Sequence, residues 1–242
     1  MSYIAKISPL GGWRAGGLEG YRRVCYEKSM IIATTNSKGG VGKSTIAVHL
    51  AVYLQRIGKQ VLVIDCDMQR SCSRWLDRMG SGLLTERITD PDEVYEHAPK
   101  LAQQVDVVIA DGPAGTDELT RALLMVCDLA LVPCGPSPLD LEASQLAVRV
   151  IRQARGIRKG DLPHALFVPN KLQANTILSS QLLEAPNILG IPAVQNPLKY
   201  RQVYAVAAGQ GQVVWQMDGA PGEAVGNMEL LCQEILDYAV RS

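Results

Sequence analysis

Short apolar runs alternate with longer amphipathic stretches along this chain. The candidate strands are residues 30–35, 60–65, 105–111, 128–133 and 165–169. They are brief, and several are rich in Val and Ile, as strands buried on both faces are. The candidate helices are residues 44–57, 116–126, 139–155, 176–183 and 228–240. This alternation predicts an α/β fold, with a mostly parallel, twisted sheet flanked by helices.

The first 29 residues do not share this pattern, since glycine pairs and aromatic residues lie among arginines with no clear period. A start of translation at Met30, just before the first strand, would make this extension an artefact of the assigned gene start. A disordered tail is a second interpretation, and a binding arm is a third. We therefore expect one folded domain over residues 30–242.

The 242 residues include 24 Lys and Arg against 24 Asp and Glu, so the formal net charge is zero. This balance excludes a protein that coats nucleic acid with its whole surface, and any DNA contact needs a local basic patch. The six cysteines form no C-x-x-C pair and the chain opens without a signal peptide, which predicts free thiols in the cytoplasm. No apolar stretch approaches the ~20 residues of a spanning helix, so we expect a soluble protein.

A glycine-rich segment follows the first strand and opens the first helix. It matches the Walker A pattern, with Ser37 in place of the usual first glycine, and it contains Lys38, Gly39, Gly40, Val41, Gly42, Lys43, Ser44 and Thr45. The N–H groups of such a loop converge on a phosphate, and the helix N-terminus favours negative charge. We expect Lys43 to reach the β- and γ-phosphates of a nucleotide, Ser44 to bind Mg²⁺ and Thr45 to contact the α-phosphate.

This segment carries a second lysine, Lys38, at the start of the loop. In this it resembles the deviant Walker A box of the ParA/MinD family of P-loop ATPases. The matching lysine of that family reaches across a dimer interface to the partner's nucleotide. The resemblance therefore implies a P-loop NTPase fold, ATP and Mg²⁺ as cofactors, and an ATP-dependent homodimer in which Lys38 neutralises charge on the transferred phosphoryl group. A solvated loop charge is the alternative for Lys38.

Two carboxylates end the second predicted strand. Asp65 and Asp67 are two positions apart and therefore point the same way on the pleat. The run Asp65-Cys66-Asp67-Met68-Gln69 is similar to the family's second signature, D-x-D-P-Q, with Met68 in place of proline. The resemblance implies that Asp67 orients or activates the attacking water and that Asp65 supports the Mg²⁺ shell. Two capping aspartates at a strand end are the structural alternative.

A third apolar run delivers Asp111 at its C-terminal edge, where ligands of open α/β sheets bind. This fits a Walker B strand whose aspartate holds Mg²⁺ through water. Residues 112–115, Gly-Pro-Ala-Gly, are expected to form a loop that moves with the γ-phosphate. Lys38, Lys43 and Asp67 are then the expected catalytic residues.

Two later segments, residues 136–140 and 201–204, are similar to the ParF-type partition ATPases, small ParA proteins without an N-terminal helix-turn-helix domain. The resemblance covers roughly residues 30–240. Asn170 follows a predicted strand at a place where P-loop proteins often read the base, so we expect it to contact adenine. Capping of the next turn is the alternative.

Basic residues recur every third position at the end of one predicted helix: Arg149, Arg152, Arg155 and Arg158, followed by Lys159. Steps of three drift slowly around a helix, so these side chains are expected to form a basic stripe. Doubled in a dimer, the stripe would hold DNA phosphates without reading sequence. Arginines at a helix C-terminus also complement the helix dipole, which is the alternative explanation.

The resemblance implies a partitioning ATPase of the bacterial cytoplasm that associates with the nucleoid. Its dimer would bind nonspecific DNA, and an adaptor or centromere-binding protein on a plasmid, chromosome or protein cargo would stimulate hydrolysis. A MinD-like membrane ATPase is one alternative, although residues 229–241 carry three acidic side chains that anionic lipid should repel. The others are an iron–sulfur carrier using Cys127 and Cys134, and a biosynthetic P-loop ligase.

Overall fold

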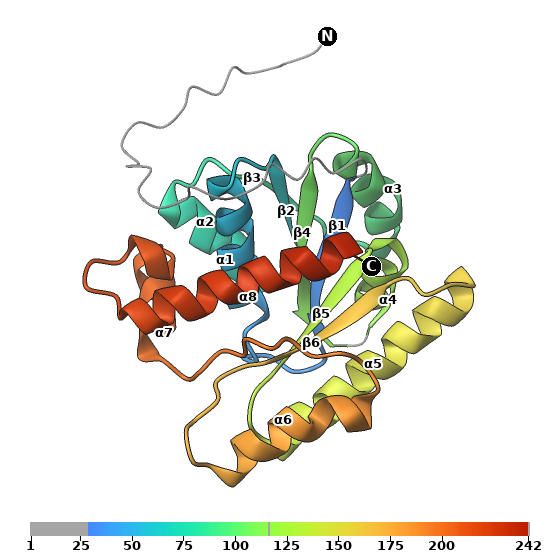
Figure 1. Cartoon of the computed structure of the whole chain (residues 1–242). Helices are drawn as coiled ribbons and strands as arrows, with labels where there is room; N and C mark the ends of the chain where they lie inside the picture. Colours follow the sequence, from blue (N-terminus) through green and yellow to red (C-terminus); the bar gives the residue numbers. More distant parts are fainter. Residues whose placement is uncertain (1–28, 116, 242) are drawn as a thin grey trace.

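The computed structural model describes residues 29–115 and 117–241. Six parallel strands form one sheet in the order β3-β2-β4-β1-β5-β6 (Figure 1). The strands are β1 (Met30–Asn36), β2 (Val61–Asp65), β3 (Leu84–Arg87), β4 (Val107–Ala114), β5 (Leu129–Cys134) and β6 (His164–Pro169). The predicted α/β class is confirmed, whereas the predicted extension lies, apart from residue 29, outside the described residues.

A helix follows each of the six strands. They are α1 (Lys43–Arg56), α2 (Ser71–Met79), α3 (Pro91–Ala102), α4 (Glu118–Val126), α5 (Pro138–Arg158), α6 (Ile177–Leu189), α7 (Gln202–Gln210) and α8 (Gly222–Arg241), with a 3₁₀ turn η1 (Val214–Gln216). The sequence pattern did not predict β3, α2, α3 or α7. The residues of β3 lie at the sheet edge and are mostly exposed, so they carry no apolar run.

The strand β4 is longer than predicted. The loop expected at residues 112–115 is therefore wrong for residues 112–114, which belong to the strand. It continues to Ala114, which pairs with Asn36 of β1. A Cβ on Gly112 would lie 2.3 Å from the Thr34 carbonyl oxygen. Glycine therefore permits the close approach that keeps residues 112–114 in the sheet.

The helices cover the sheet in two layers. Met30 and Ile32 of β1 pack with α1, α2, α7 and α8, whereas Ile31 and Ala33 pack with α3, α4, α5 and α6. This alternation follows from the two-residue period of a strand. Among the described residues, no helix combines the length and the apolar character needed to cross a bilayer.

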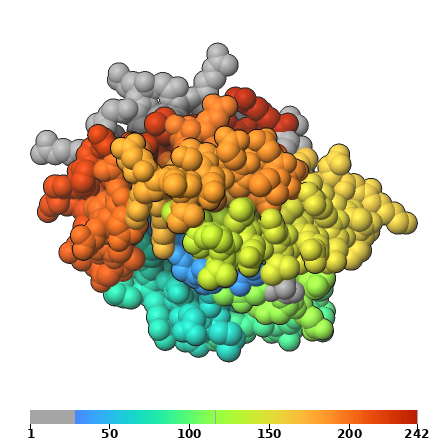
Figure 2. Space-filling model, turned by 90° about the horizontal axis from the view of Figure 1, so that it is seen from below, coloured from blue at the N-terminus to red at the C-terminus, as the bar shows by residue number. Residues whose placement is uncertain are grey.

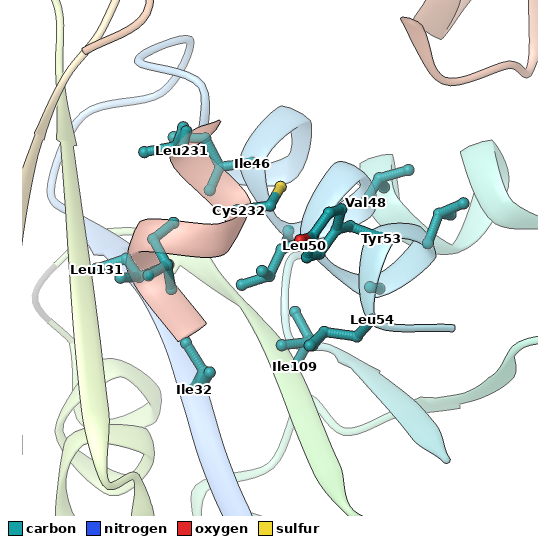
Figure 3. Close-up of a cluster of buried hydrophobic side chains, with 14 of the residues drawn as sticks. Ile32, Ile46, Val48, Leu50, Tyr53, Leu54, Ile109, Leu131, Leu231 and Cys232 are labelled. Carbon is teal, nitrogen blue, oxygen red and sulfur yellow. The ribbon is translucent and has the colours of Figure 1, made fainter. Parts of the chain in front are cut away.

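Helix α1 is the centre of the first layer and is apolar around most of its circumference. Its residues Ile46, Leu50 and Leu54 are fully or almost fully buried. Leu231 and Cys232 of α8 lie against this helix, above the strand residues of the sheet (Figure 3). A helix enclosed in this way is fixed by packing, so its N-terminus is a rigid support for the loop before it.

One buried histidine joins α1 to the segment after α7. The Nδ1 atom of His49 lies 2.8 Å from the Thr45 carbonyl oxygen, and its Nε2 atom accepts a hydrogen bond from the Val214 N–H (3.1 Å). The rings of Trp75, Tyr204 and Trp215 meet the imidazole edge-on. Because Nε2 is an acceptor, the imidazole must be neutral, with its proton on Nδ1.

We predict that His49 makes stability depend on pH. Burial lowers the pKa of His49 to about 4, against a weaker opposing effect of the Thr45 carbonyl. In the unfolded chain the pKa of His49 is about 6.5. The free energy of unfolding should therefore decrease by about 3 kcal/mol as the pH falls from above 6.5 to below 4. Urea unfolding at pH 7.5, 6 and 5 should show a smaller loss of unfolding free energy on acidification in His49→Gln than in the wild type. His97→Gln, at an exposed position of α3, is the control, and equal pH slopes for His49→Gln and wild type would contradict the prediction.

Candidate active site

The glycine-rich segment predicted to bind phosphate, residues 37–45, joins β1 to the first turn of α1 and is called the P-loop below. Gly40 and Gly42 have φ angles of 77° and 107°, in the left-handed region that glycine favours. A Cβ on Gly42 would also lie 2.2 Å from Nδ2 of Asn170, so no side chain fits there. The Lys43 ammonium turns back and donates to the carbonyl oxygens of Lys38 (3.0 Å) and Asn36 (3.4 Å). The segment has the curved backbone, the helix N-terminus and the cation that a phosphate site requires.

Asp111 lies at the same edge of the sheet, where the carboxyl ends of β1, β2 and β4 meet. It is the register partner of Thr34 in β1 and of Asp65 in β2. The Thr34 hydroxyl donates to its Oδ1 atom (3.0 Å), whereas Oδ2 is buried and has no hydrogen-bond partner among the described residues. A buried carboxylate oxygen without a partner, near Ser44 at the start of α1, fits a hydrated Mg²⁺ ion.

Burial shifts the pKa of Asp111 and that of the nearby Lys43. Burial raises the pKa of Asp111 to about 7, with a smaller increase from Asp65, while the hydroxyls of Ser44 and Thr34 and the Lys43 ammonium act in the opposite direction. Burial also lowers the pKa of Lys43, and the charges of Asp111 and Asp67 oppose that change. A cation would stabilise the charged form of Asp111, and a negatively charged ligand would stabilise the charged form of Lys43.

The segment between β2 and α2, residues 66–70, is called the switch loop below. Asp67 lies in it and borders the cleft beside the P-loop. Its Oδ1 atom accepts a hydrogen bond from the Gln69 N–H (2.8 Å). Asp65 is buried, and its carboxylate accepts hydrogen bonds from Asp67 in the switch loop and from Ser73 in the first turn of α2. The Mg²⁺ role expected of Asp65 stays a prediction, because these contacts already occupy both of its oxygens.

Lys38 is paired within its own chain. Its ammonium forms an ion pair with the Asp140 carboxylate in the first turn of α5. The side chain of Lys38 is 41% exposed and that of Asp140 is 15% exposed, so the pair lies at the surface near the P-loop. The Lys38 ammonium is therefore bonded to its own chain.

Asn170 has a structural role that the sequence did not predict. Its Nδ2 atom donates to the Val41 carbonyl oxygen (2.8 Å), and its Oδ1 atom accepts from the Lys171 N–H (2.8 Å). The Lys171 ammonium donates to the Gly40 carbonyl oxygen (2.6 Å). Both residues therefore support the P-loop from the end of β6, and adenine contact by Asn170 stays a prediction. The dipeptide Asn170-Lys171 after a strand indicates a functional position. The sequence does not reveal that these two side chains bond to carbonyl oxygens of the P-loop.

These elements surround one cleft of about 1130 Å³. Figure 2 looks onto this edge of the sheet, where the blue surface that includes the P-loop lies recessed between teal, green and orange segments. The cleft is lined by the P-loop, the switch loop and the end of β4, and also by Arg74, Trp75 and Arg78 of α2. The last three were not predicted, because α2 was not recognised. The volume is slightly above the range of roughly 300–1,000 Å³ that is usual for small-molecule sites, and it accommodates a nucleotide.

The basic stripe on α5 is largely bonded to the protein itself. Arg152 donates to the Leu189 carbonyl oxygen, Arg155 to that of Pro163, and Arg158 to those of Leu124 and Cys127. Arg155 and Arg158 are only partly exposed. The exposed basic positions of the stripe are thus reduced to Arg149, Arg152 and Lys159, and DNA contact there stays a prediction.

Known proteins share this fold. The chain is 29% identical over 218 residues to the maintenance of carboxysome distribution protein A of Halothiobacillus neapolitanus, covering 86% of this chain and 97% of that protein. The MinD cell division protein of Aquifex aeolicus superposes with a TM-score of 0.71 at 16% identity, over 86% of this chain and 97% of that one. The septum site-determining protein MinD of Pyrococcus horikoshii, complexed with Mg-ADP, superposes with a TM-score of 0.69 at 18% identity, over 87% and 97% of the two chains.

The family model described as the CobQ/CobB/MinD/ParA nucleotide binding domain matches residues 32–214, which include the P-loop, both aspartates of the second signature and Asp111. The match thus covers most of the chain and every residue that lines the cleft. With its parallel sheet and its second P-loop lysine, this chain belongs to the ParA/MinD family of P-loop ATPases.

Proposed function

We propose that this protein is a ParA-like ATPase that dimerises with ATP, binds DNA nonspecifically and positions a cargo through an adaptor that stimulates hydrolysis. The observation that carries the proposal is one cleft that collects the P-loop, Asp67 and the end of β4, with Lys38 beside it. ATP and Mg²⁺ are its cofactors in this proposal. The likeness to a MinD complexed with Mg-ADP supports that assignment.

Each side chain has a defined task in this reaction. The P-loop amides and Lys43 bind the phosphates, while Ser44 and Asp111 hold Mg²⁺, which when bound offsets the negative charge of the phosphates. Asp67 orients the attacking water and accepts its proton. Lys38 leaves Asp140 when two chains meet, and then reaches the nucleotide of the partner subunit.

The cargo is a plasmid, a chromosomal locus or a protein assembly. The likeness to a carboxysome distribution protein over nearly its whole length supports a role in positioning. The same proposal includes a partner protein that acts as adaptor. It also includes an association with the nucleoid through DNA. Arg149, Arg152 and Lys159 are the positions of the α5 stripe most open to a DNA backbone.

The packing of α8 argues against a MinD-like membrane cycle. Met228, Leu231 and Ile235 of this helix are buried in the core. Its acidic residues are also bonded, Glu229 to Arg56 and Glu234 to the backbone of residues 195 and 196. A lipid surface would therefore have to compete with the core for the apolar face of α8.

An iron–sulfur cluster is disfavoured by the positions of the two cysteines considered for it. Cys127 precedes β5 and Cys134 ends it, so they lie at opposite ends of one strand. Both are buried, and burial raises the pKa of Cys127 to about 12 and that of Cys134 to about 11. Thiols of this kind are poor metal ligands, because a ligand must be a thiolate.

We predict that Asp67→Ala binds ATP normally but hydrolyses it at least about 100-fold more slowly, because the phosphate cradle remains while water activation is lost. The variant should accumulate as an ATP-bound dimer, which light scattering after gel filtration would detect. Asp77→Ala, at an exposed position of α2, is the matched control. A normal turnover rate in Asp67→Ala would show that another residue activates the water.

Mixing two inactive variants tests whether Lys38 acts across the dimer. Lys38→Ala and Asp67→Ala alone should both be nearly inactive. A mixed dimer has one site with its own Asp67 and the partner's Lys38, so an equimolar mixture should recover about a quarter of the wild-type rate per chain if pairing is random. If Lys38 acts only within its own chain, the mixture stays as inactive as its components.

Retention of arbitrary duplex DNA tests the carrier role. At low salt, the protein with ATP should retain DNA and the protein with ADP should not, and retention should fall steeply as salt is raised. Arg149→Ala combined with Arg152→Ala should weaken retention, whereas Lys100→Ala on α3 should not. A protein that hydrolyses ATP but never retains DNA would remove the DNA-carrier part of the proposal.

A further inference from the structure

We infer that Ser73 is a positioning residue for hydrolysis, because together with Asp65 it closes the switch loop that carries Asp67. The inference rests on the proposed role of Asp67 as the group that activates water. It gives Asp65 a second task besides any Mg²⁺ contact, and it adds a residue of α2 that the sequence analysis did not identify.

One buried carboxylate holds both ends of the switch loop. At the first end, the Asp67 N–H donates to Oδ1 of Asp65 (3.0 Å). Just past the second end, in the first turn of α2, the Ser73 N–H (2.8 Å) and the Ser73 hydroxyl (2.7 Å) both donate to Oδ2 of Asp65. Asp65 is fully buried, so these bonds are shielded from competing water.

Asp65 is itself fixed by the sheet. It lies in register with Asp111 of β4 and with Arg87 of β3, and its carbonyl oxygen accepts from the Ile88 N–H (3.3 Å). Its neighbour Cys66 donates its N–H to the Asp111 carbonyl oxygen (3.0 Å). The first end of the switch loop therefore begins from a rigid strand.

The second end is fixed through α2. The Trp75 indole N–H donates to the Gln212 carbonyl oxygen (2.9 Å), and Arg78 donates to that of Gly209 (3.1 Å). Trp75 is also buried against His49 of α1. These contacts hold the later turns of α2, while the bonds of Ser73 to Asp65 hold its first turn, next to the switch loop.

Between these two fixed ends, Asp67 is held by the loop itself. The Gln69 N–H binds its Oδ1 atom, and the Arg70 N–H binds its carbonyl oxygen (3.0 Å). Arg70 has a φ of 55°, an unfavourable angle for a residue with a side chain, so the loop depends on its end contacts to stay in this form. Met68 is 69% exposed and contributes little packing to replace them.

Ser73→Ala tests this inference, because it removes the hydroxyl bond and leaves the helix N-terminus otherwise intact. We expect kcat for ATP hydrolysis to fall about tenfold, since a small displacement of a catalytic group has effects of this order or larger. Nucleotide affinity and the Mg²⁺ concentration for half-maximal rate should not change. Hydrogen exchange in residues 66–70 of the nucleotide-free protein should become faster, and Ser73→Thr, which keeps a hydroxyl, should restore both properties.

Ser180→Ala is the matched control, since this exposed hydroxyl also bonds locally near the start of a helix, on α6 far along the chain. Wild-type kcat and wild-type exchange in Ser73→Ala would overturn the inference. A raised Mg²⁺ requirement with unchanged exchange would also overturn it, in favour of an effect through the metal. If the wild type hydrolyses no ATP while Ser73→Ala still exchanges faster, the proposed function fails and the closure of the loop by Ser73 stands.

Discussion

The register of three neighbouring strands is the constraint on which the whole site depends. The strand β4 lies between β1 and β2, and Asp111 pairs with Thr34 on one side and with Asp65 on the other. A shift of one residue in either pairing would turn Asp111 to the opposite face of the sheet. Gly112 secures the pairing with β1, because any side chain there would collide with the Thr34 carbonyl oxygen.

This register also determines the electrostatics of the site. It buries Asp111 beside the first turn of α1, where burial raises its pKa to about 7 and lowers the pKa of Lys43. Each charge partly compensates the burial of the other. An anionic phosphate and a divalent cation would complete the arrangement, since the polar groups that bind them are already oriented and need little rearrangement.

The net charge is zero, and several cationic side chains are in addition bonded to groups of their own chain. Lys38 is paired with Asp140, Lys171 with the Gly40 carbonyl oxygen, and Arg158 with two carbonyl oxygens at the end of α4. Such contacts leave few unbonded positive charges along α5. A partner that binds phosphate backbones would therefore meet a modest field, and dimerisation would be needed to strengthen it. This agrees with a proposed cycle in which DNA is released at each turnover.

The sequence by itself determined five of the six strands, the P-loop and the order of the aspartates, because apolar strands and glycine-rich turns are local patterns. It did not reveal β3, α2, α3 or α7. The strand β3 has only four residues, and α2 and α7 have nine each, so their apolar positions are few, while α3 contains Pro99, a residue that disfavours a helix interior. Only the tertiary structure decided that Asn170 supports the P-loop and that the α5 arginines bond to neighbouring segments. It also decided that Asp65 joins β2 to Ser73. In each case the partner is a backbone group, or a side chain brought close by folding. Sequence carries no signal for such a partner, since every residue has a carbonyl and an amide and only the fold selects which one is near.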